Sequence, residues 1–235
     1  MITQEQFDTG LRLDQYIASI SQNKENFRAN FIKAIEAYSP DDILFFRSLP
    51  QKIRVAVVTD DENQDALRDV PLIGRISVEV GRVMLRAFRP SEHPDVVFAL
   101  AKPLGAIEAS RVTLPIIVFY SEDMRMLGAH IQRLPDLNVD MHDRQRAWVE
   151  AHPEVLDAHK PVAEMSPITR TRMAQILFSL TSEQRLHWAR KTVSTWRAIL
   201  TPPAVVVAAD NASESVSAAP VVQPPTDSTT QPDRS

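Results

Sequence analysis

The chain has 235 residues, of which 44% are hydrophobic and 24% are charged, and its formal net charge is −4. These proportions are typical of a globular protein, and the negative charge argues against the broad basic face that nucleic-acid binding needs. The chain contains no cysteine, which excludes disulfides, thiolate nucleophiles and cysteine-ligated metal centres.

Residues 1–50 are predicted to form a helical extension. Phe27, Phe31 and Ile35 recur at helical spacing, and the stretch 11–20 has the same rhythm. Ser39 followed by Pro40 predicts the start of a third helix, because serine is a good cap and proline suits the first helical turn.

Residues 51–135 alternate between strand and helix patterns. Runs rich in branched apolar residues predict strands at 53–58, 83–88, 114–120 and 125–131, with helices at 63–80 and 94–104 between them. Two strand–helix units favour parallel neighbours, and the short polar turn 121–123 makes the last pair an antiparallel hairpin. We therefore expect an α/β fold with a mixed four-stranded sheet.

Residues 136–200 are predicted to pack on this core. The stretch 134–167 is polar and rich in proline, and we expect only a short helix at 144–151. A long amphipathic helical region is expected at 168–200, with Leu186, Val193 and Trp196 on one face. That face favours packing on the core, and pairing of two chains into a homodimer is the alternative.

Residues 201–235 differ from the rest of the chain. They contain six of the seventeen prolines and no aromatic residue, so they cannot bury enough apolar surface to offset the entropy of ordering. We predict a disordered tail that serves as a solubilising tether or, alternatively, as a partner-binding segment.

One motif resembles a bacterial branch of the thioredoxin family. In that branch a strand ends in a Thr-acid-Asp-Trp-Cys-Gly-Asp-Ala pattern, and Val-Pro follows in the helix. The matching residues here are Thr59, Asp60, Asp61, Asp65, Ala66, Val70 and Pro71, while Glu62, Asn63 and Gln64 replace the Trp, Cys and Gly. Thr113, Leu114 and Pro115 precede the third strand, where the thioredoxin fold carries its cis-proline. The resemblance covers roughly residues 5–135.

The resemblance implies a thioredoxin-like sheet without the family's chemistry. In such proteins the cysteine lies at the first turn of a helix, where the helix dipole stabilises its thiolate. Asn63 has no ionisable proton and cannot attack a disulfide. The edge formed by Thr113 and Leu114 is then either an inert structural turn or, as the family resemblance implies, an edge that binds an extended peptide by strand addition.

The acidic residues Asp60, Asp61, Glu62 and Asp65 have two interpretations. Asp61 or Glu62 caps the helix and the others complement its dipole, or the cluster binds a hard cation or does acid–base work. No EF-hand spacing or glycine-rich phosphate loop supports a metal or nucleotide, so we expect no cofactor. The six histidines lack metal-ligand spacing, and we expect each to be exposed.

The leading hypothesis from the sequence is a non-catalytic protein- or peptide-binding scaffold. Its predicted surface joins the loop 60–65 to 113–115. The rivals are a hydrolase or metal-dependent enzyme that uses the acidic cluster, and a structural subunit of a larger assembly. No run approaches about 18 apolar residues, and the first residues lack the pattern of a secretory signal. We therefore expect a cytoplasmic protein with neither a membrane nor a nucleic-acid partner.

Overall fold

A computed structural model of the protein describes residues 1–63, 65–104, 114–131, 134–161, 164–178 and 180–201. The elements, in chain order, are α1 (Gln4–Asp8), α2 (Leu13–Ser19), α3 (Lys24–Lys33), η1 (Ala34–Ala37), α4 (Pro40–Arg47), β1 (Ile53–Val58), α5 (Ala66–Val80), β2 (Val83–Phe88), α6 (Pro94–Ala101), η2 (Lys102–Leu104), β3 (Ile116–Tyr120), β4 (Met126–Ile131), α7 (Pro135–Ala151), α8 (Pro167–Phe178) and α9 (Ser182–Leu200). The predicted disordered tail lies, apart from Thr201, outside the described residues.

The four strands form one mixed sheet in the order β2-β1-β3-β4. β1 runs parallel to β2, and β3 runs antiparallel to both β1 and β4. The predicted mixed sheet and its final hairpin are confirmed. The expectation that the second strand–helix unit also gives a parallel neighbour is wrong, because β3 runs against β1. β3 begins at the end of the sheet where β1 finishes, since Ile116 pairs with Val58.

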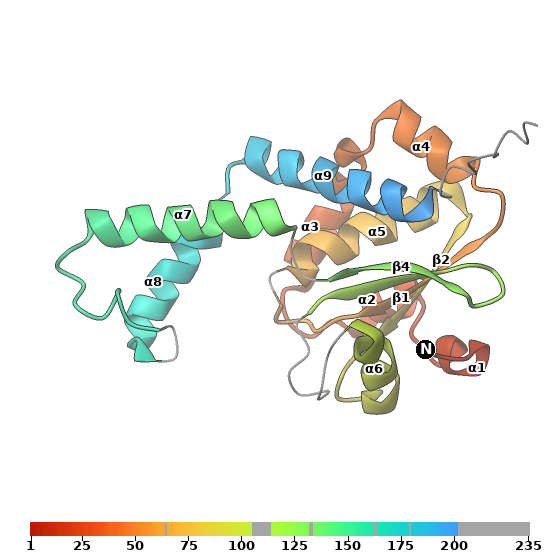
Figure 1. Cartoon of the computed structure of the whole chain (residues 1–235), viewed down its shortest axis with the longest axis horizontal. Coiled ribbons are helices and arrows are strands. Elements are labelled where there is room, and N and C mark those ends of the chain that lie inside the picture. The colour runs from red at the N-terminus through yellow and green to blue at the C-terminus, as the bar shows by residue number, and fades with distance from the viewer. Residues whose placement is uncertain (64, 105–113, 132–133, 162–163, 179, 202–235) are drawn as a thin grey trace, which may run out of the picture. The chain divides into compact units, whose positions relative to one another are not determined.

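Helices cover both faces of the sheet (Figure 1). One face, with Val55, Val57 and Phe119, packs against apolar residues of α2, α3, α4, α5 and α9. The other face, with Ala56 and Val118, packs against α6 and against Phe7 of α1. Both faces of β1 and β3 are therefore buried, which explains their near-continuous runs of branched apolar residues.

Helix α5 contains a proline, and a neighbouring helix compensates for it. Pro71 has no N–H group, so the carbonyl of Leu67 cannot be satisfied by the usual bond within the helix. Asn30 of α3 donates its side-chain amide to that carbonyl at 2.7 Å. At the other end, Gly81 adopts φ +63° and terminates the helix, as the sequence predicted. The bond from Asn30 therefore ties the first turns of α5 to α3.

One prediction for residues 134–200 is wrong. The stretch expected to be irregular, with a short helix at 144–151, contains the full helix α7. It buries only Leu137, Met141 and Trp148, so its apolar stripe is too sparse to stand out in the sequence. The helical region expected at 168–200 contains two helices, α8 and α9, and Thr181 and Gln184 form the reciprocal capping box that starts α9.

Helix α9 packs on the sheet through the face that the sequence indicated. Trp196 is fully buried and its ring lies 6.2 Å from that of Phe119 on β3. Val193 and Leu200 are buried in the same core. This face is therefore used within the chain, and pairing of two chains through α9 stays a prediction. Within the described residues, no helix is both long and apolar enough to cross a membrane.

Candidate functional site

Asn63 connects the start of α5 to the segment before β3. Its side-chain oxygen accepts a hydrogen bond from the backbone N–H of Ala66 at 2.9 Å, so it caps the helix. Its side-chain amide donates to the carbonyl of Leu114 at 3.3 Å. The two segments that the sequence predicted to lie side by side are thus joined by one residue. The prediction that Asp61 or Glu62 caps this helix is wrong.

The peptide bond between Leu114 and Pro115 is cis, as predicted. Pro115 is buried and Leu114 is half-buried, and Leu114 packs against the core between the sheet and α6. The carbonyl of Leu114 already accepts the bond from Asn63, so this part of the predicted peptide-binding edge is engaged within the chain. Thr113 and Gln64, the other predicted site residues here, lie outside the described residues.

Asp61 holds the site to the N-terminal helices. Its carboxylate accepts hydrogen bonds from the backbone N–H of Ser21 at 2.9 Å and from the Arg89 guanidinium at 3.0 Å. The Asp61 and Arg89 side chains are only 10% and 14% exposed, so this pair is shielded from solvent. Burial by itself would lower the pKa of Arg89, but the Asp61 carboxylate raises that pKa above its usual value.

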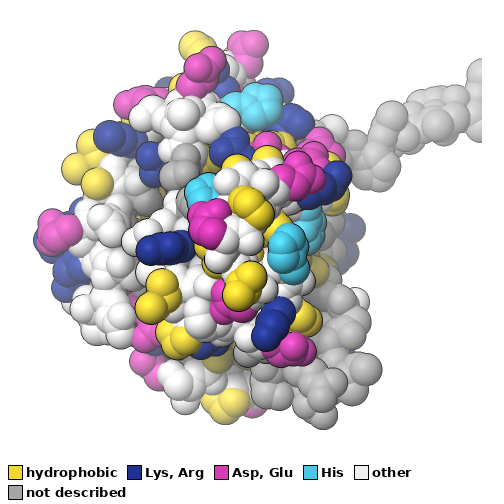
Figure 2. Space-filling view, turned by 90° about the vertical axis from the view of Figure 1, so that its left-hand side faces the viewer, with side chains coloured by type: hydrophobic (Ala, Val, Ile, Leu, Met, Phe, Trp, Pro, Cys, Tyr) yellow, Lys and Arg dark blue, Asp and Glu magenta, His cyan; other side chains and the backbone are white. Residues whose placement is uncertain are grey.

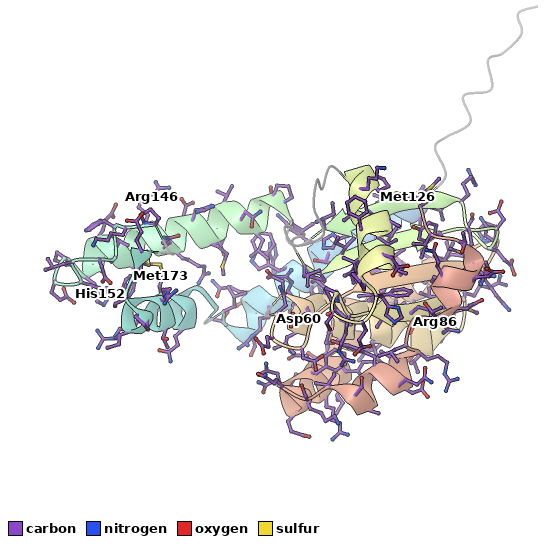
Figure 3. The ribbon with its side chains drawn as sticks, turned by 90° about the horizontal axis from the view of Figure 1, so that it is seen from below. Asp60, Arg86, Met126, Arg146, His152 and Met173 are labelled. Atoms are coloured by element: carbon purple, nitrogen blue, oxygen red, sulfur yellow. The ribbon has the colours of Figure 1, made fainter. Side chains whose placement is uncertain are left out.

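Asp60 and Glu62 are the two exposed carboxylates of the loop. Asp60 accepts a bond from the backbone N–H of Glu62 at 2.8 Å and so shapes the turn. Glu62 accepts a bond from the Gln22 amide at 2.8 Å. Figure 3 labels Asp60 in the loop that follows β1. These two carboxylates give the rim of the site a negative charge.

Asp65 belongs to a buried charge cluster behind the site. Arg68 donates to Asp65 at 3.1 Å and makes two 2.7 Å bonds to Asp69, which is fully buried. His130 of β4 lies 3.5 Å from Asp69 and is only 4% exposed. The prediction that every histidine is exposed is therefore wrong for His130. Arg68 follows Asp65 at helical i, i+3 spacing, a pairing signal that the sequence does carry.

Tyr16 lies beneath this loop. Its hydroxyl is 3.5 Å from that of Thr59, and the Arg89 guanidinium lies over its ring at 5.3 Å. Burial raises the pKa of Tyr16 to about 12, so the phenol stays neutral at physiological pH. Neither Tyr16 nor Arg89 could be placed here from sequence, because both come from segments far from the motif.

A cavity of about 370 Å³ opens beside the loop. Its walls come from Asp60–Glu62, from Ser21 and Gln22, and from Arg89–Ser91. Asn63 follows this wall directly in the chain. The cavity is large enough for the side chain of a bound peptide, and its rim carries the exposed carboxylates of Asp60 and Glu62.

The loop 60–63 presents hydrogen-bonding and charged side chains. Asn63 offers amide donors and acceptors but no nucleophile. Asp61 binds Arg89 and Asp65 binds Arg68, so these carboxylates serve ion pairs and do not converge on a common point. Across the part of the chain that the structure describes, no group of three or more His, Asp or Glu side chains is arranged to hold a metal ion.

No protein-family profile and no curated protein matches the sequence. Among solved structures, the chain is similar to the crystal structure of an HIV epitope scaffold, at 12% identity and a TM-score of 0.54. It is also similar to the crystal structure of a protein of unknown function from Pseudomonas aeruginosa, at 14% identity and a TM-score of 0.53. Each similarity covers 85% of this chain and 98% of the other chain. At these identities the similarity shows the fold alone.

Proposed function

We propose that the chain is a thioredoxin-like protein without redox activity that binds a protein or an extended peptide. The binding surface is the loop 60–63 together with the half-buried Leu114, which precedes the buried Pro115. The observation that carries this proposal is the double engagement of Asn63, which caps α5 and bonds the carbonyl before the cis-proline. Asparagine takes the place that the family resemblance gives to the cysteine, and it holds the two segments of the site together.

The features around Asn63 favour binding over catalysis. The cavity beside it is walled by polar and charged groups that are fixed by ion pairs and backbone bonds. Preformed walls bind a ligand without a large cost of ordering. Because the exposed carboxylates of Asp60 and Glu62 line this cavity, we expect a bound peptide to place a Lys or Arg side chain there.

A selection of displayed peptides on the full chain tests the proposal. Selected peptides should bind at least about tenfold more weakly to an Asn63→Trp variant, since the indole would block the surface. Val78→Trp is the matched control, because Val78 is 62% exposed near the other end of α5. Thermal unfolding of both variants would verify that they fold.

Two results would contradict the proposal. Peptides that bind both tryptophan variants equally well would place the binding surface elsewhere. Measurable reduction of insulin disulfides above the uncatalysed rate with dithiothreitol would show that the chain has redox activity after all.

A further inference from the structure

A second cavity, of about 680 Å³, lies between α7 and the segment that follows it. One wall is a single face of α7 that carries His142, Gln145, Arg146 and Val149, which are spaced as neighbours on a helix surface. The opposite wall comes from residues 158–160. None of these residues belongs to the site around Asn63, so this cavity needs an explanation of its own.

The wall opposite α7 is held in place by hydrogen bonds and by a small apolar core. Asp157 accepts bonds from the backbone N–H of Ser166 and from the Thr169 hydroxyl, both at 2.6 Å. Ala158 is buried against Trp148 in a cluster that also contains Met165 and Met173. Figure 3 labels Met173 on α8, where it faces α7. The segment that carries His159 and Lys160 is therefore anchored at its start.

The cavity lining combines positive groups with an apolar floor. Arg146 and Lys160 are cationic, and the side chains of His142, His159 and Gln145 can each donate hydrogen bonds. Glu150 is the one carboxylate among the described lining residues, and Val149 and Ala158 supply apolar surface. Figure 2, which views the left-hand side of Figure 1, shows histidine and Lys or Arg side chains on this face, with Asp or Glu side chains among them.

Arg146 has guanidinium N–H donors that remain available to a ligand. It makes a hydrogen bond to Asp143 at 2.8 Å through one guanidinium nitrogen, and both side chains of this pair are more than half exposed. A guanidinium has five N–H donors in a planar fork that matches carboxylate and phosphate oxygens. Exposed ion pairs are weak, so a bound oxyanion can replace Asp143 as the partner of Arg146.

We propose that this cavity binds a small organic anion. The carboxylate or phosphate of the ligand would bind Arg146, Lys160 and the two imidazoles, and its apolar body would lie on Val149 and Ala158. The cavity volume of about 680 Å³ is within the range of roughly 300–1,000 Å³ that is typical of small-molecule sites. This site is independent of the function proposed for the Asn63 surface.

Titration of the full chain with phenyl phosphate and with benzoate, followed by NMR, tests the assignment. We expect saturable shifts of the backbone amides of α7 and residues 158–160 and of the His142 and His159 imidazole signals. Benzyl alcohol, a neutral analogue of similar size, should leave these signals almost unchanged. Saturation by only one of the two anions would support the proposal and would identify the oxyanion that the cavity prefers.

A matched pair of double variants provides the control. Arg146→Gln with Lys160→Gln should weaken binding of the anion by at least about tenfold, since two charge-assisted contacts are lost. Arg170→Gln with Arg172→Gln removes the same charge from the exposed face of the neighbouring helix α8 and should change affinity by less than about twofold. Equal weakening in both double variants, equal binding of the alcohol, or shifts that do not saturate would overturn the proposal.

Discussion

Replacing Arg68 by Met tests whether the charge cluster behind Asn63 stabilises the protein. Asp69 is fully buried, and the two 2.7 Å bonds from Arg68 satisfy its carboxylate. Removing one partner of a buried ion pair costs about 3–5 kcal/mol, because the remaining charge is left uncompensated. That is a large part of the roughly 5–15 kcal/mol by which a typical domain is stable. We therefore expect Arg68→Met to lower the free energy of unfolding by about 3 kcal/mol or more near pH 7.

The pH dependence of this loss follows from the ionisation of Asp69. Burial by itself would raise the pKa of Asp69, but Arg68 and then His130 hold it below its usual value. In the wild type, the stabilisation that ionised Asp69 provides is complete above about pH 3.9, because that is the pKa of this carboxyl in the unfolded chain. It is lost as the pH falls through the lower pKa that the carboxyl has in the folded protein. In the variant, Arg68 no longer opposes the effect of burial, so the pKa of Asp69 in the folded state should exceed about 3.9. Protonation of Asp69 at acidic pH then stabilises the folded variant. The difference between the two proteins should be largest near neutral pH and should shrink on acidification.

Urea unfolding at about pH 7 and about pH 4.5 measures this difference. Arg75→Met is the matched control, because Arg75 lies on the same helix and pairs with Glu79 at 3.3 Å, with both side chains about 30% exposed. Such partly exposed pairs contribute about 0–1 kcal/mol. If Arg68→Met and Arg75→Met cost the same, or if the Arg68→Met loss grows in acid, the reasoning about the buried cluster is refuted.

Three further predictions concern separate parts of the fold. Asn63→Ala removes a helix cap and should cost about 1 kcal/mol in urea unfolding; no loss would show that the cap is not needed. Gly128→Val should destabilise the protein by about 1–3 kcal/mol, because a Cβ at Gly128 would lie 2.7 Å from Cγ2 of Ile199; stability equal to the wild type would contradict this packing. The Thr169 hydroxyl and neighbouring N–H groups lower the pKa of Asp157 to about 2, so its contribution to stability is full above about 3.9 and is lost as the pH falls through about 2. An NMR titration of this carboxyl with a midpoint near 3.9 would contradict its hydrogen bonds.

The strands were predictable from their runs of branched apolar residues, which are nearly continuous in β1 and β3 because both faces of these strands are buried. The runs at 53–58 and 83–88 match β1 and β2 residue for residue, and Ser39 and Gly81 mark helix ends as predicted. Only residues 144–151 of α7 were predicted to be helical, since the few buried residues of this helix are widely spaced. The break between α8 and α9 was missed although its Thr-x-x-Gln signal is present in the sequence.

For the candidate site, the sequence predicted which segments take part but not the contacts between their side chains. The motif placed Asn63 at the start of a helix, and the proline before β3 placed the partner segment. Sequence could not show that Asp61 binds Arg89, because that pair depends on a contact between loops far apart in the chain. The burial of His130 likewise depends on how β4 packs against α5 and α9, which no local pattern encodes.

Replacing Asn63 by Cys tests most directly whether the side chain at this position lies at the N-terminal end of α5, whose first residue is Ala66. A thiol there lies where the backbone N–H of Ala66 now bonds Asn63, so its pKa should fall below the ~8.5 of a free cysteine. Ser48→Cys supplies the control, because Ser48 is the exposed C-cap of α4, where the helix dipole disfavours a thiolate. Because the chain has no other cysteine, absorbance of the thiolate near 240 nm reports each single thiol. A lower pKa at position 63 than at position 48 agrees with the structure, and a value of 8.5 or higher at position 63 would contradict it.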